Sequence, residues 1–426
     1  MKIAVIGTGI SGNAASWLLH KNHDITVYER YDTPGGHART VMLDGHPPID
    51  VGFTLFNQWT SPNFTDLLKT LDVSTAQAGF SFGFSLDGGN LEYAMHNHFA
   101  QKKNKLSPPF LAMIKDIRRF YTSAPKYLDS KEPNMPLGVY LKKHGYSQNF
   151  VKNHLLPMAA CLWSVGAGSF LKMPARAFIR VVKSNRLFIK NAPDWLSVEG
   201  GSSTYVDKMV EPFRDKILFG TAAVSVYRRA EGVEVADSRG NIGLYDAIVM
   251  ACHTDQALRL IQDATDQEKE ILKHIPYVLN KAYLHQDESL MPGLKSVWSA
   301  WNYFHSNKDG QACVTHWLNK MQMHLGTAQN YFLTLNPPVE PQHVLKEMTF
   351  YTPALNGNAM KLWRDLRKIQ GRLRTWYCGA WCGYGFHEDG LSAGLRVAES
   401  IGPDMRPWQV KESSPAGTYA APEKDG

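Results

Sequence analysis

The chain has 426 residues, of which 44% are hydrophobic and 20% are charged, and this composition predicts a globular protein rather than a disordered or fibrous one. Its 46 Lys and Arg exceed its 39 Asp and Glu, which gives a formal net charge of +7. The mean hydropathy is −0.30, and no run approaches the ~18 apolar residues of a membrane-spanning helix, which argues against an integral membrane protein. Five scattered cysteines without CxxC spacing and no recognisable export signal predict no metal site and a cytoplasmic location.

The first predicted unit combines a strand, a glycine-rich turn, a helix and a second strand. Residues 3–6 form the first strand, the turn is Gly7-Thr8-Gly9-Ile10-Ser11-Gly12, residues 13–20 are helical, and residues 24–29 end on Glu29. In such a unit the glycines permit a tight turn, a close approach to a pyrophosphate and close helix packing. The terminal acid accepts hydrogen bonds from a ribose. The sequence therefore predicts a dinucleotide site containing Gly7, Gly9, Ser11, Gly12 and Glu29.

A second glycine pair follows the acid. The segment Glu29-Arg30 and then Gly35-Gly36-His37-Ala38-Arg39-Thr40 resembles the FAD-binding superfamily of flavin amine oxidases and phytoene-desaturase-like enzymes. The resemblance implies FAD as cofactor and a returning strand at Asp50-Val51-Gly52. His37 stands where many relatives have Arg, so Arg39 is the expected phosphate partner. By this resemblance, the cofactor contacts include Arg30, Gly35, Gly36, His37, Arg39, Thr40 and Gly52.

The middle of the chain returns to the same predicted domain. A strand begins at Trp195 and a helix extends through Met209, and further strands are expected at 222–227, 232–236 and 245–251. This order resembles the middle segment of the superfamily, which implies that Val224 lies beside the adenine.

The far end predicts a second strand, glycine-dense turn and helix, in residues 376–401. By resemblance, Gly379 and Ala380 and the backbone of Asp389, Gly390 and Leu391 face the flavin. Ala380 stands where many relatives carry an acid that holds the ribityl chain.

Four segments narrow the resemblance: GYGFHEDGL at 383–391, WSAWNY at 298–303, THWLNKMQ at 315–322 and TLNP at 334–337. Together they look like flavoproteins encoded beside cyclopropane-fatty-acid-synthase-like methyltransferases. This resemblance implies a lipid or fatty-acyl substrate and a functional link to such a methyltransferase.

The predicted fold class is α/β: a Rossmann-like FAD-binding domain of the amine oxidase type with an inserted α+β substrate domain. We expect the discontinuous FAD domain in 1–60, 195–255 and 346–405, the substrate domain in 61–194 and 256–345, and a disordered tail in 406–426.

The charge is concentrated in one insert. Residues 101–193 hold seventeen Lys and Arg against three Asp and Glu, a balance of +14, which leaves the rest of the chain at −7. Residues 110–121 and 178–190 interleave apolar and basic residues. Both segments suit a helix lying on an anionic membrane surface, and equally a solvated basic face over a core helix. No nucleic-acid module is visible, so we expect no nucleic-acid partner.

The catalytic candidates combine pattern and resemblance. Strands at 298–303 and 315–319 are expected over the flavin face, where Trp301 forms an apolar wall and Asn302 and His316 supply polar groups. His387 and Glu388, in the flavin turn, are the first candidates for proton transfer. Core packing or turn stabilisation are the alternative roles of these residues.

Four functions stay open. The first is FAD-dependent removal of a hydride from an activated carbon of a lipid acyl chain, by desaturation of unsaturated or methyl-branched groups. The others are a flavin amine oxidase, a carotenoid-type desaturase or isomerase, and a non-catalytic flavoprotein partner of a lipid methyltransferase. The basic insert argues against a cationic amine substrate.

Overall fold

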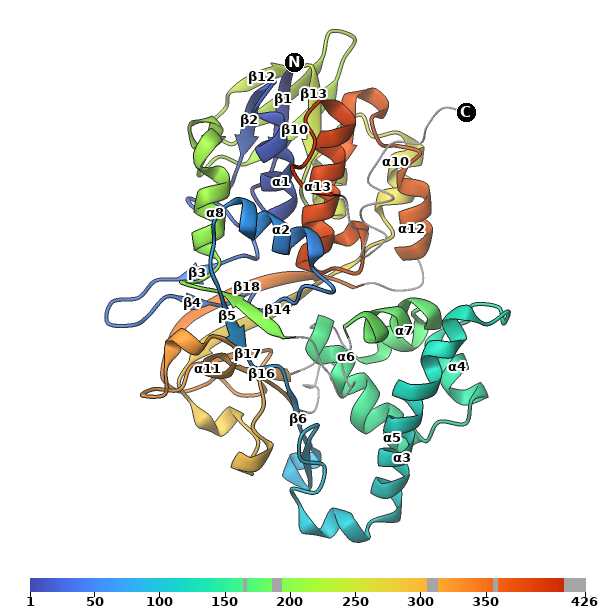
Figure 1. The fold of residues 1–426 in the computed structure, drawn as a ribbon. Helices are drawn as coiled ribbons and strands as arrows, with labels where there is room; N and C mark the ends of the chain where they lie inside the picture. Colours follow the sequence, from blue (N-terminus) through green and yellow to red (C-terminus); the bar gives the residue numbers. More distant parts are fainter. Residues whose placement is uncertain (164–166, 186–193, 305–312, 355–358, 410–426) are drawn as a thin grey trace.

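The computed structural model describes residues 1–163, 167–185, 194–304, 313–354 and 359–409 (Figure 1). The predicted tail overlaps the end of this range, and its residues from 410 onward lie outside it. We call the two halves of the molecule the parallel-sheet half and the mixed-sheet half, after the sheets that they contain.

The parallel-sheet half is organised by a five-stranded sheet that combines distant parts of the chain. All four strand pairings in this sheet are parallel. The internal strands are short, almost entirely buried apolar runs, as expected for strands covered on both faces. In spatial order the strands are β19 (Thr375–Tyr377), β13 (Ala247–Met250), β1 (Lys2–Ile6), β2 (Asp24–Tyr28) and β9 (Ile217–Leu218).

Helices α1 (Ile10–Leu19) and α13 (His387–Ile401) pack closely against each other beside this sheet (Figure 1). A Cβ atom on Gly394 would lie 2.1 Å from the carbonyl oxygen of Ser11. The two helices, one from each end of the chain, therefore pack so closely at this point that only glycine fits between their backbones. Helix α8 (Ser203–Val210) packs on α1, and α12 (Ala359–Leu366) contacts α10 (Asp266–Leu272), which follows α9 (Thr254–Leu260).

A three-stranded antiparallel sheet extends the parallel-sheet half. It consists of β10 (Ala223–Arg228), β11 (Val233–Asp237) and β12 (Ile242–Tyr245). The pairing of β10 with β11 is irregular between Ala223 and Ser225, which displaces Val224 from the ladder.

The mixed-sheet half contains a seven-stranded sheet in which only the pairing of β6 with β15 is parallel. Short α11 (Leu318–Met321) follows one of its strands. In spatial order the strands are β18 (Val344–Pro353), β14 (Tyr277–His285), β17 (Phe332–Leu335), β16 (Cys313–Trp317), β15 (Trp301–Phe304), β6 (Phe82–Leu86) and β7 (Leu91–Ala94).

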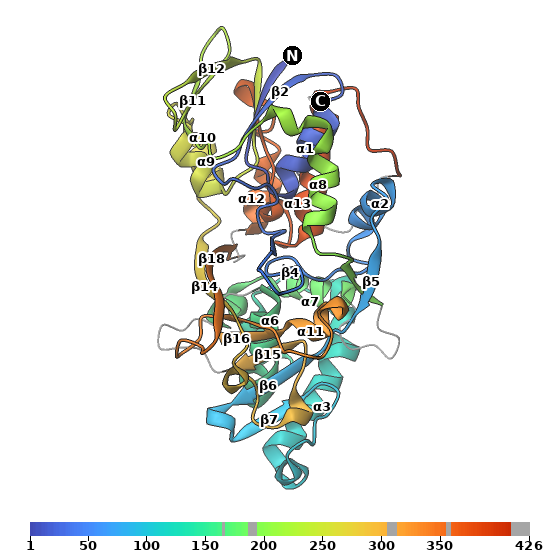
Figure 2. The same cartoon turned by 90° about the vertical axis from the view of Figure 1, so that its left-hand side faces the viewer.

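Two short ribbons lie near the boundary between the halves. They pair β3 (Thr40–Val41) with β4 (Ile49–Asp50), and β5 (Thr75–Ala78) with β8 (Trp195–Val198). In Figure 2 the chain passes between the halves near β14 and β18 on one side and near β5 on the other.

The basic insert is largely helical. Its helices are α3 (Pro108–Ser123), α4 (Leu137–Lys143), α5 (Gln148–Phe150), α6 (Leu156–Trp163) and α7 (Ala175–Ser184), with a π-helical turn at Val151–Leu155. Of the helices in the described ranges, none has the length and apolar character needed to cross a bilayer.

Of the two alternatives for residues 110–121 and 178–190, the part that the structure describes fits a solvated basic face over a core helix. Helix α3 buries Phe110, Met113 and Phe120, and α7 buries Phe178 and Val182. These side chains are already packed in the core, so they are not available to lipid. Residues 186–190 of the second segment lie outside the described ranges.

The structure also moves the expected domain boundaries. Helix α2 (Pro62–Thr70) packs on α13, and α9 and α10 contact β10 and α12, so these helices belong to the parallel-sheet half. Strand β18, expected in the FAD domain, joins the mixed sheet instead. Sequence boundaries failed here because tertiary packing, and not composition, assigns a short helix to one half.

Candidate functional site

A chamber of about 720 Å³ lies between the two halves. Strands β1, β2, β13 and β19 run parallel, so the loops that follow them meet at one edge of the sheet, where such folds bind ligands. Each of these loops contributes to the chamber, through Gly7, Glu29, Cys252 and Gly379 among others.

The glycine-rich turn takes the shape that a dinucleotide motif requires. Gly7 has a φ of +101°, which favours glycine, and a Cβ on Gly12 would lie 1.9 Å from the Gly7 carbonyl oxygen. A Cβ on Gly9 would meet no atom within 4 Å, because Gly9 faces the chamber. Helix α1 begins at the next residue with no side-chain cap, so its first N–H groups are available to a phosphate.

Glu29 is buried at the end of β2 and lines the chamber. Its Oε2 accepts hydrogen bonds from the backbone N–H and the hydroxyl of Thr8, and its Oε1 accepts one from the N–H of Tyr31 at 2.9 Å. These donors hold the carboxylate in place, and its remaining lone pairs can accept from ribose hydroxyls.

The second glycine segment runs beside the first. Gly35, Gly36, His37 and Arg39 all line the chamber, as do Ser11 and Arg30. Gly52 also lines it and packs on the backbone of this segment, since a Cβ there would lie 2.0 Å from the carbonyl oxygen of His37. Desolvation lowers the pKa of His37, so its imidazole is neutral at pH 7 and Arg39 is the cation that this segment offers.

Several predicted cofactor residues do not face the chamber. Val224 is 50% exposed, because the irregularity in β10 turns it outward, while the neighbouring Ala222 and Ala223 line the chamber. Thr40 donates to Asp50 Oδ1 at 2.6 Å and accepts from the N–H of Ser203. Neither side chain lines the chamber, so a role of Val224 and Thr40 in cofactor binding stays a prediction from the resemblance.

Helix packing accounts for three further predicted residues. Gly12 packs on the Gly7 backbone, and Gly390 packs on Ile10, whose side chain a Cβ would approach to 2.7 Å. Leu391 is fully buried in the core. None of the three is among the residues that line the chamber in the described structure, so they act on the site by setting helix positions.

In the flavin turn, Gly379, Ala380 and Asp389 line the chamber. The Oδ2 of Asp389 accepts from the N–H of Phe386 at 2.8 Å and so caps the start of α13. The two acids that follow Ala380 in this turn, Glu388 and Asp389, both accept hydrogen bonds at helix N-termini.

Glu388 caps a different helix. Its carboxylate accepts from the N–H groups of Asn63 and Phe64 at 3.0 and 2.9 Å, and from the Asn63 side-chain amide at 2.7 Å. Burial raises the pKa of Glu388 to about 7, against the opposing effect of these donors. Glu388 therefore joins α13 to the N-terminus of α2, and this contact supports the alternative role that the sequence left open.

His387 lines the chamber and is surrounded by aromatic side chains. Its Nε2 lies 2.8 Å from the hydroxyl of Tyr205, and its ring stacks on Phe53 with centroids 3.8 Å apart. Burial lowers the pKa of His387 to about 3, so the ring is neutral at pH 7. It can position a hydroxyl or pass a proton through the Tyr205 contact, but it does not supply a positive charge.

The mixed-sheet half contributes an apolar wall. Trp301 on β15 and His316 on β16 line the chamber with ring centroids 5.9 Å apart. Phe80 stacks on Trp195 at 4.0 Å and contacts Trp301 edge-on at 4.9 Å. The pair of stacked rings leaves no gap in which a ligand could be sandwiched.

Asn302 does not reach this wall. It is fully buried, accepts from the N–H of Ser299 at 2.9 Å, and donates to the carbonyls of Ser299 and Thr315. Strand alternation points this side chain away from the chamber, and its contacts favour the core-packing alternative for Asn302.

His316 is the polar group of the wall. Burial lowers the pKa of His316 to about 4, so it is neutral at pH 7. Its Nε2 atom is buried, and the described residues offer it no hydrogen-bond partner. Buried polar atoms normally have a partner, so this nitrogen is suited to a group on a bound molecule.

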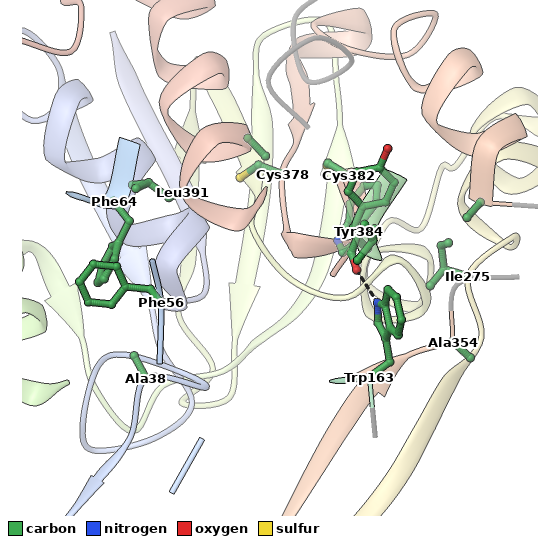
Figure 3. Packing of buried hydrophobic residues seen from close by; sticks show 14 of the residues in the cluster. Ala38, Phe56, Phe64, Trp163, Ile275, Ala354, Cys378, Cys382, Tyr384 and Leu391 are labelled. Atoms are coloured by element: carbon green, nitrogen blue, oxygen red, sulfur yellow. Dashed lines mark hydrogen bonds between the residues drawn. The ribbon is translucent and has the colours of Figure 1, made fainter. Parts of the chain in front are cut away.

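Several chamber residues carry no local sequence signal. Trp163 on α6 donates from Nε1 to the carbonyl of Tyr384 at 2.9 Å, which ties the insert to the flavin turn (Figure 3). Phe350 on β18 lies against His37, with ring centroids 5.4 Å apart. Only tertiary structure brings these positions together.

A lysine and two cysteines could in principle act on a flavin, but their positions in the structure do not favour it. Lys281 pairs with Glu347 at 3.8 Å on an exposed surface of β14 and β18. Cys378 and Cys382 are fully buried, and burial raises the pKa of both thiols, which argues against a reactive thiolate at either position.

These observations together fit a dinucleotide cofactor. The open position at Gly9, the uncapped start of α1, the fixed Glu29 carboxylate and the Arg39 cation all face one chamber. No cluster of His, Cys, Asp and Glu able to hold a metal ion occurs within the described residues.

Comparisons with known proteins agree with this geometry. A family model for NAD(P)-binding Rossmann-like domains matches residues 5–71. Hydroxyneurosporene desaturase of Rubrivivax gelatinosus is 41% identical over 56 residues, which are 13% of this chain and 10% of the desaturase. The chain thus matches about a tenth of that relative's length, over the dinucleotide motif.

Solved structures extend the comparison to nearly the whole chain. Cyclohexylamine oxidase from Brevibacterium oxydans has a TM-score of 0.69 at 15% identity, covering 94% of this chain and 98% of the oxidase. A putrescine oxidase variant has a TM-score of 0.67 at 13% identity, and the match covers 94% of this chain and 98% of the variant. A CLA-producing fatty acid isomerase from P. acnes has a TM-score of 0.63 at 15% identity, and the match covers 92% of this chain and 96% of the isomerase.

At these identities the similarity establishes the fold, which this chain shares with the two amine oxidases and with the fatty acid isomerase. The predicted Rossmann-like α/β fold of the amine oxidase type is confirmed. The expectation of FAD as cofactor agrees with this fold and with the matched Rossmann-like segment.

Proposed function

We propose that this chain is an FAD-dependent oxidoreductase that removes a hydride from an activated carbon of a lipid acyl chain. The activated carbon is allylic or branched, because the positive charge left by hydride loss needs stabilisation there. The proposal rests on the character of the chamber wall opposite the dinucleotide motif.

The carrying observation is that this wall is aromatic and that, within the described part of the chain, no carboxylate of the mixed-sheet half lines the chamber. Trp301, Phe80 and Trp195 form it, and the acids of the flavin turn, Glu388 and Asp389, accept hydrogen bonds at two helix N-termini. A substrate ammonium would find no counter-ion there on the observed contacts, whereas an acyl chain would be desolvated by the rings.

The residues that would hold FAD are those of the dinucleotide motif. The N–H groups at the start of α1 and Arg39 suit the pyrophosphate, Glu29 suits a ribose, and Ala222 and Ala223 line the chamber beyond it. When bound, FAD would accept a hydride from substrate carbon.

The chain's own contribution is orientation and exclusion of water. The aromatic wall orients an apolar chain against the cofactor site, and the His316 nitrogen can hydrogen-bond a carbonyl or hydroxyl of the substrate. Because His316 and His387 are neutral at pH 7, neither brings a positive charge close to the carbon that loses the hydride.

An amine oxidase is the second candidate, because cyclohexylamine and putrescine oxidases share the fold. The fatty acid isomerase shares it as well, so fold alone does not decide the substrate. The desaturase similarity covers the cofactor motif and carries no information on the wall. A link to a lipid methyltransferase stays a prediction from the resemblance.

The deciding experiment is anaerobic mixing of the flavin-loaded protein with phospholipid vesicles bearing unsaturated, methyl-branched or cyclopropane chains, followed by flavin absorbance. We expect bleaching with one of these lipids and none with cyclohexylamine or putrescine. Bleaching by amines alone would contradict the proposal. No bleaching by any lipid would favour a non-catalytic partner protein.

A substitution at His316 tests the wall. His316→Phe fills the same space without a hydrogen-bonding nitrogen, so we expect bleaching about ten-fold slower at an unchanged flavin content, the cost of one lost hydrogen bond. His324→Phe is the matched control, because His324 is an exposed histidine that contacts the Pro48 carbonyl outside the chamber. An equal loss of bleaching rate in both variants would show that His316 has no specific role in the site.

A further inference from the structure

The far end of the mixed-sheet half forms a distinct surface, which we call the basic tip and define as residues 96–115. It contains the loop after β7, a 3-10 turn at Lys102–Leu106 and the first turns of α3. Figure 1 shows this segment at the end of the molecule opposite the parallel sheet.

The basic tip exposes large apolar side chains. Leu106 is 87% exposed, Leu111 42% and Phe99 38%. Their neighbours Phe110 and Met113 are buried, so the core of α3 is complete without them. Apolar side chains gathered at a protruding end, and not required by the core, commonly mark a contact surface.

The charged side chains within the basic tip are all lysines. Lys102, Lys103, Lys105 and Lys115 are exposed. No acid occurs between Glu92 and Asp116 in the sequence. Both of these carboxylates are buried, and their hydrogen bonds go to Gly293 and Leu294 and to Ser147 and Arg119, respectively.

We propose that the basic tip docks onto the surface of an anionic phospholipid bilayer. Leu106, Leu111 and Phe99 would enter the boundary between head groups and acyl chains, and the four lysines would contact anionic head groups. This surface shares Leu111 and Lys115 with the segment 110–121, but it uses exposed side chains and not the helix face that the core buries. The inference goes beyond the proposed function, because it holds for any substrate.

A bilayer fits this surface better than a nucleic acid does. A polyanionic nucleic acid would use the lysines but gain little from an exposed leucine, whereas interfacial binding uses both. The apolar side chains therefore distinguish the two partners experimentally.

The test is co-sedimentation of the full-length, flavin-loaded protein with large vesicles of phosphatidylcholine, with or without phosphatidylglycerol. We expect binding only when phosphatidylglycerol is present, and weaker binding at high salt. Two variants divide the surface: Leu106→Ser with Leu111→Gln, and Lys102→Gln with Lys103→Gln and Lys105→Gln. Each should lower the partition coefficient about ten-fold or more.

Matched control variants come from the opposite end of the molecule. Ile242→Ser removes an apolar side chain that is 67% exposed on β12. Lys269→Gln with Lys273→Gln and Lys361→Gln removes three charges from exposed ion pairs around Asp266 and Glu270. Both controls should bind vesicles as the unmodified protein does. Flavin absorbance and Tm confirm that all variants are folded.

Two results would overturn the proposal. One is no binding to phosphatidylglycerol vesicles by the unmodified protein. The other is binding that the lysine variant loses and the leucine variant keeps, together with equal retention on double-stranded DNA, which would identify a general polyanion surface. Acyl-chain oxidation is measured separately by flavin bleaching, so failure of one proposal leaves the other standing.

Discussion

The two halves of the molecule build the same chamber in opposite ways. In the parallel-sheet half, the groups of the dinucleotide motif that face it lie close together in the chain, between Gly7 and Arg39. In the mixed-sheet half the facing groups include Phe80, Trp163, Trp301 and Phe350, which come from separate segments of the chain. The first arrangement depends on backbone shape and is visible as a motif, whereas the second depends on packing between distant elements.

The sharpest test of this difference is a pair of glycine substitutions in one turn. Gly12→Ala places a Cβ 1.9 Å from the Gly7 carbonyl oxygen, so α1 must move from β1. We expect a loss of about 3 kcal/mol in the free energy of unfolding and loss of bound flavin. Denaturant titration and flavin content measure the two effects.

Gly9→Ala is the matched variant, because its Cβ meets no protein atom within 4 Å. Its Tm without cofactor should stay unchanged, while FAD affinity should fall about ten-fold or more, since the new methyl group occupies space in the chamber. Normal FAD binding by Gly9→Ala would show that the pyrophosphate does not lie against Gly9.

Acid should destabilise the mixed-sheet half at its buried histidines. His285 on β14 is fully buried, and burial lowers its pKa to about 4, below the ordinary value of 6.5. The unfolded chain then binds more protons between pH 6.5 and 4, so stability is complete above pH 6.5 and falls as the pH drops. The loss approaches about 3 kcal/mol near pH 4 for this one group.

His285→Gln tests that assignment. The variant loses its contacts to Thr334 and Asp287, so it should be less stable at pH 7. Its stability should nevertheless depend less steeply on pH, by up to one bound proton. An unchanged pH slope would show that His285 does not titrate as the burial requires.

Glu388 tests whether a residue of the cofactor motif acts on chemistry or on packing. Glu388→Ala leaves the N–H groups of Asn63 and Phe64 without their acceptor, so we expect a loss of about 2 kcal/mol. Flavin bleaching by substrate should be unchanged per bound flavin, and Glu388→Gln should restore most of the stability. A collapse of bleaching in the Gln variant would return Glu388 to a catalytic role.

The smallest effect is expected at the outward-facing position on β10. Val224→Ser should leave FAD affinity within about two-fold, because Val224 is half exposed and does not line the chamber. Ala223→Leu, one residue earlier, adds bulk inside the chamber and should weaken FAD binding. FAD titration measures both affinities. A larger loss of affinity for Val224→Ser than for Ala223→Leu would support the expected contact of Val224 with the adenine.

Predictions from the sequence succeeded where a local pattern carries the geometry. The GxGxxG turn, the acid at Glu29 and the second glycine pair are adjacent in the chain, so their spacing specifies where they lie in space. Spacing could not predict the side-chain direction at single positions such as Val224 and Asn302. A β-irregularity or the alternation of one strand decides which way these side chains point, and neither can be read from spacing.

The amino-acid sequence by itself determined the dinucleotide motif, the α/β class and the concentration of positive charge in one insert, because each depends on residues that are neighbours in the chain. Only the tertiary structure decided which half each short helix joins, that Glu388 caps α2, and that the apolar faces of α3 and α7 are core. Burial is a property of the packed chain, and the same amphipathic helix can face a membrane or a protein interior until its neighbours are in place.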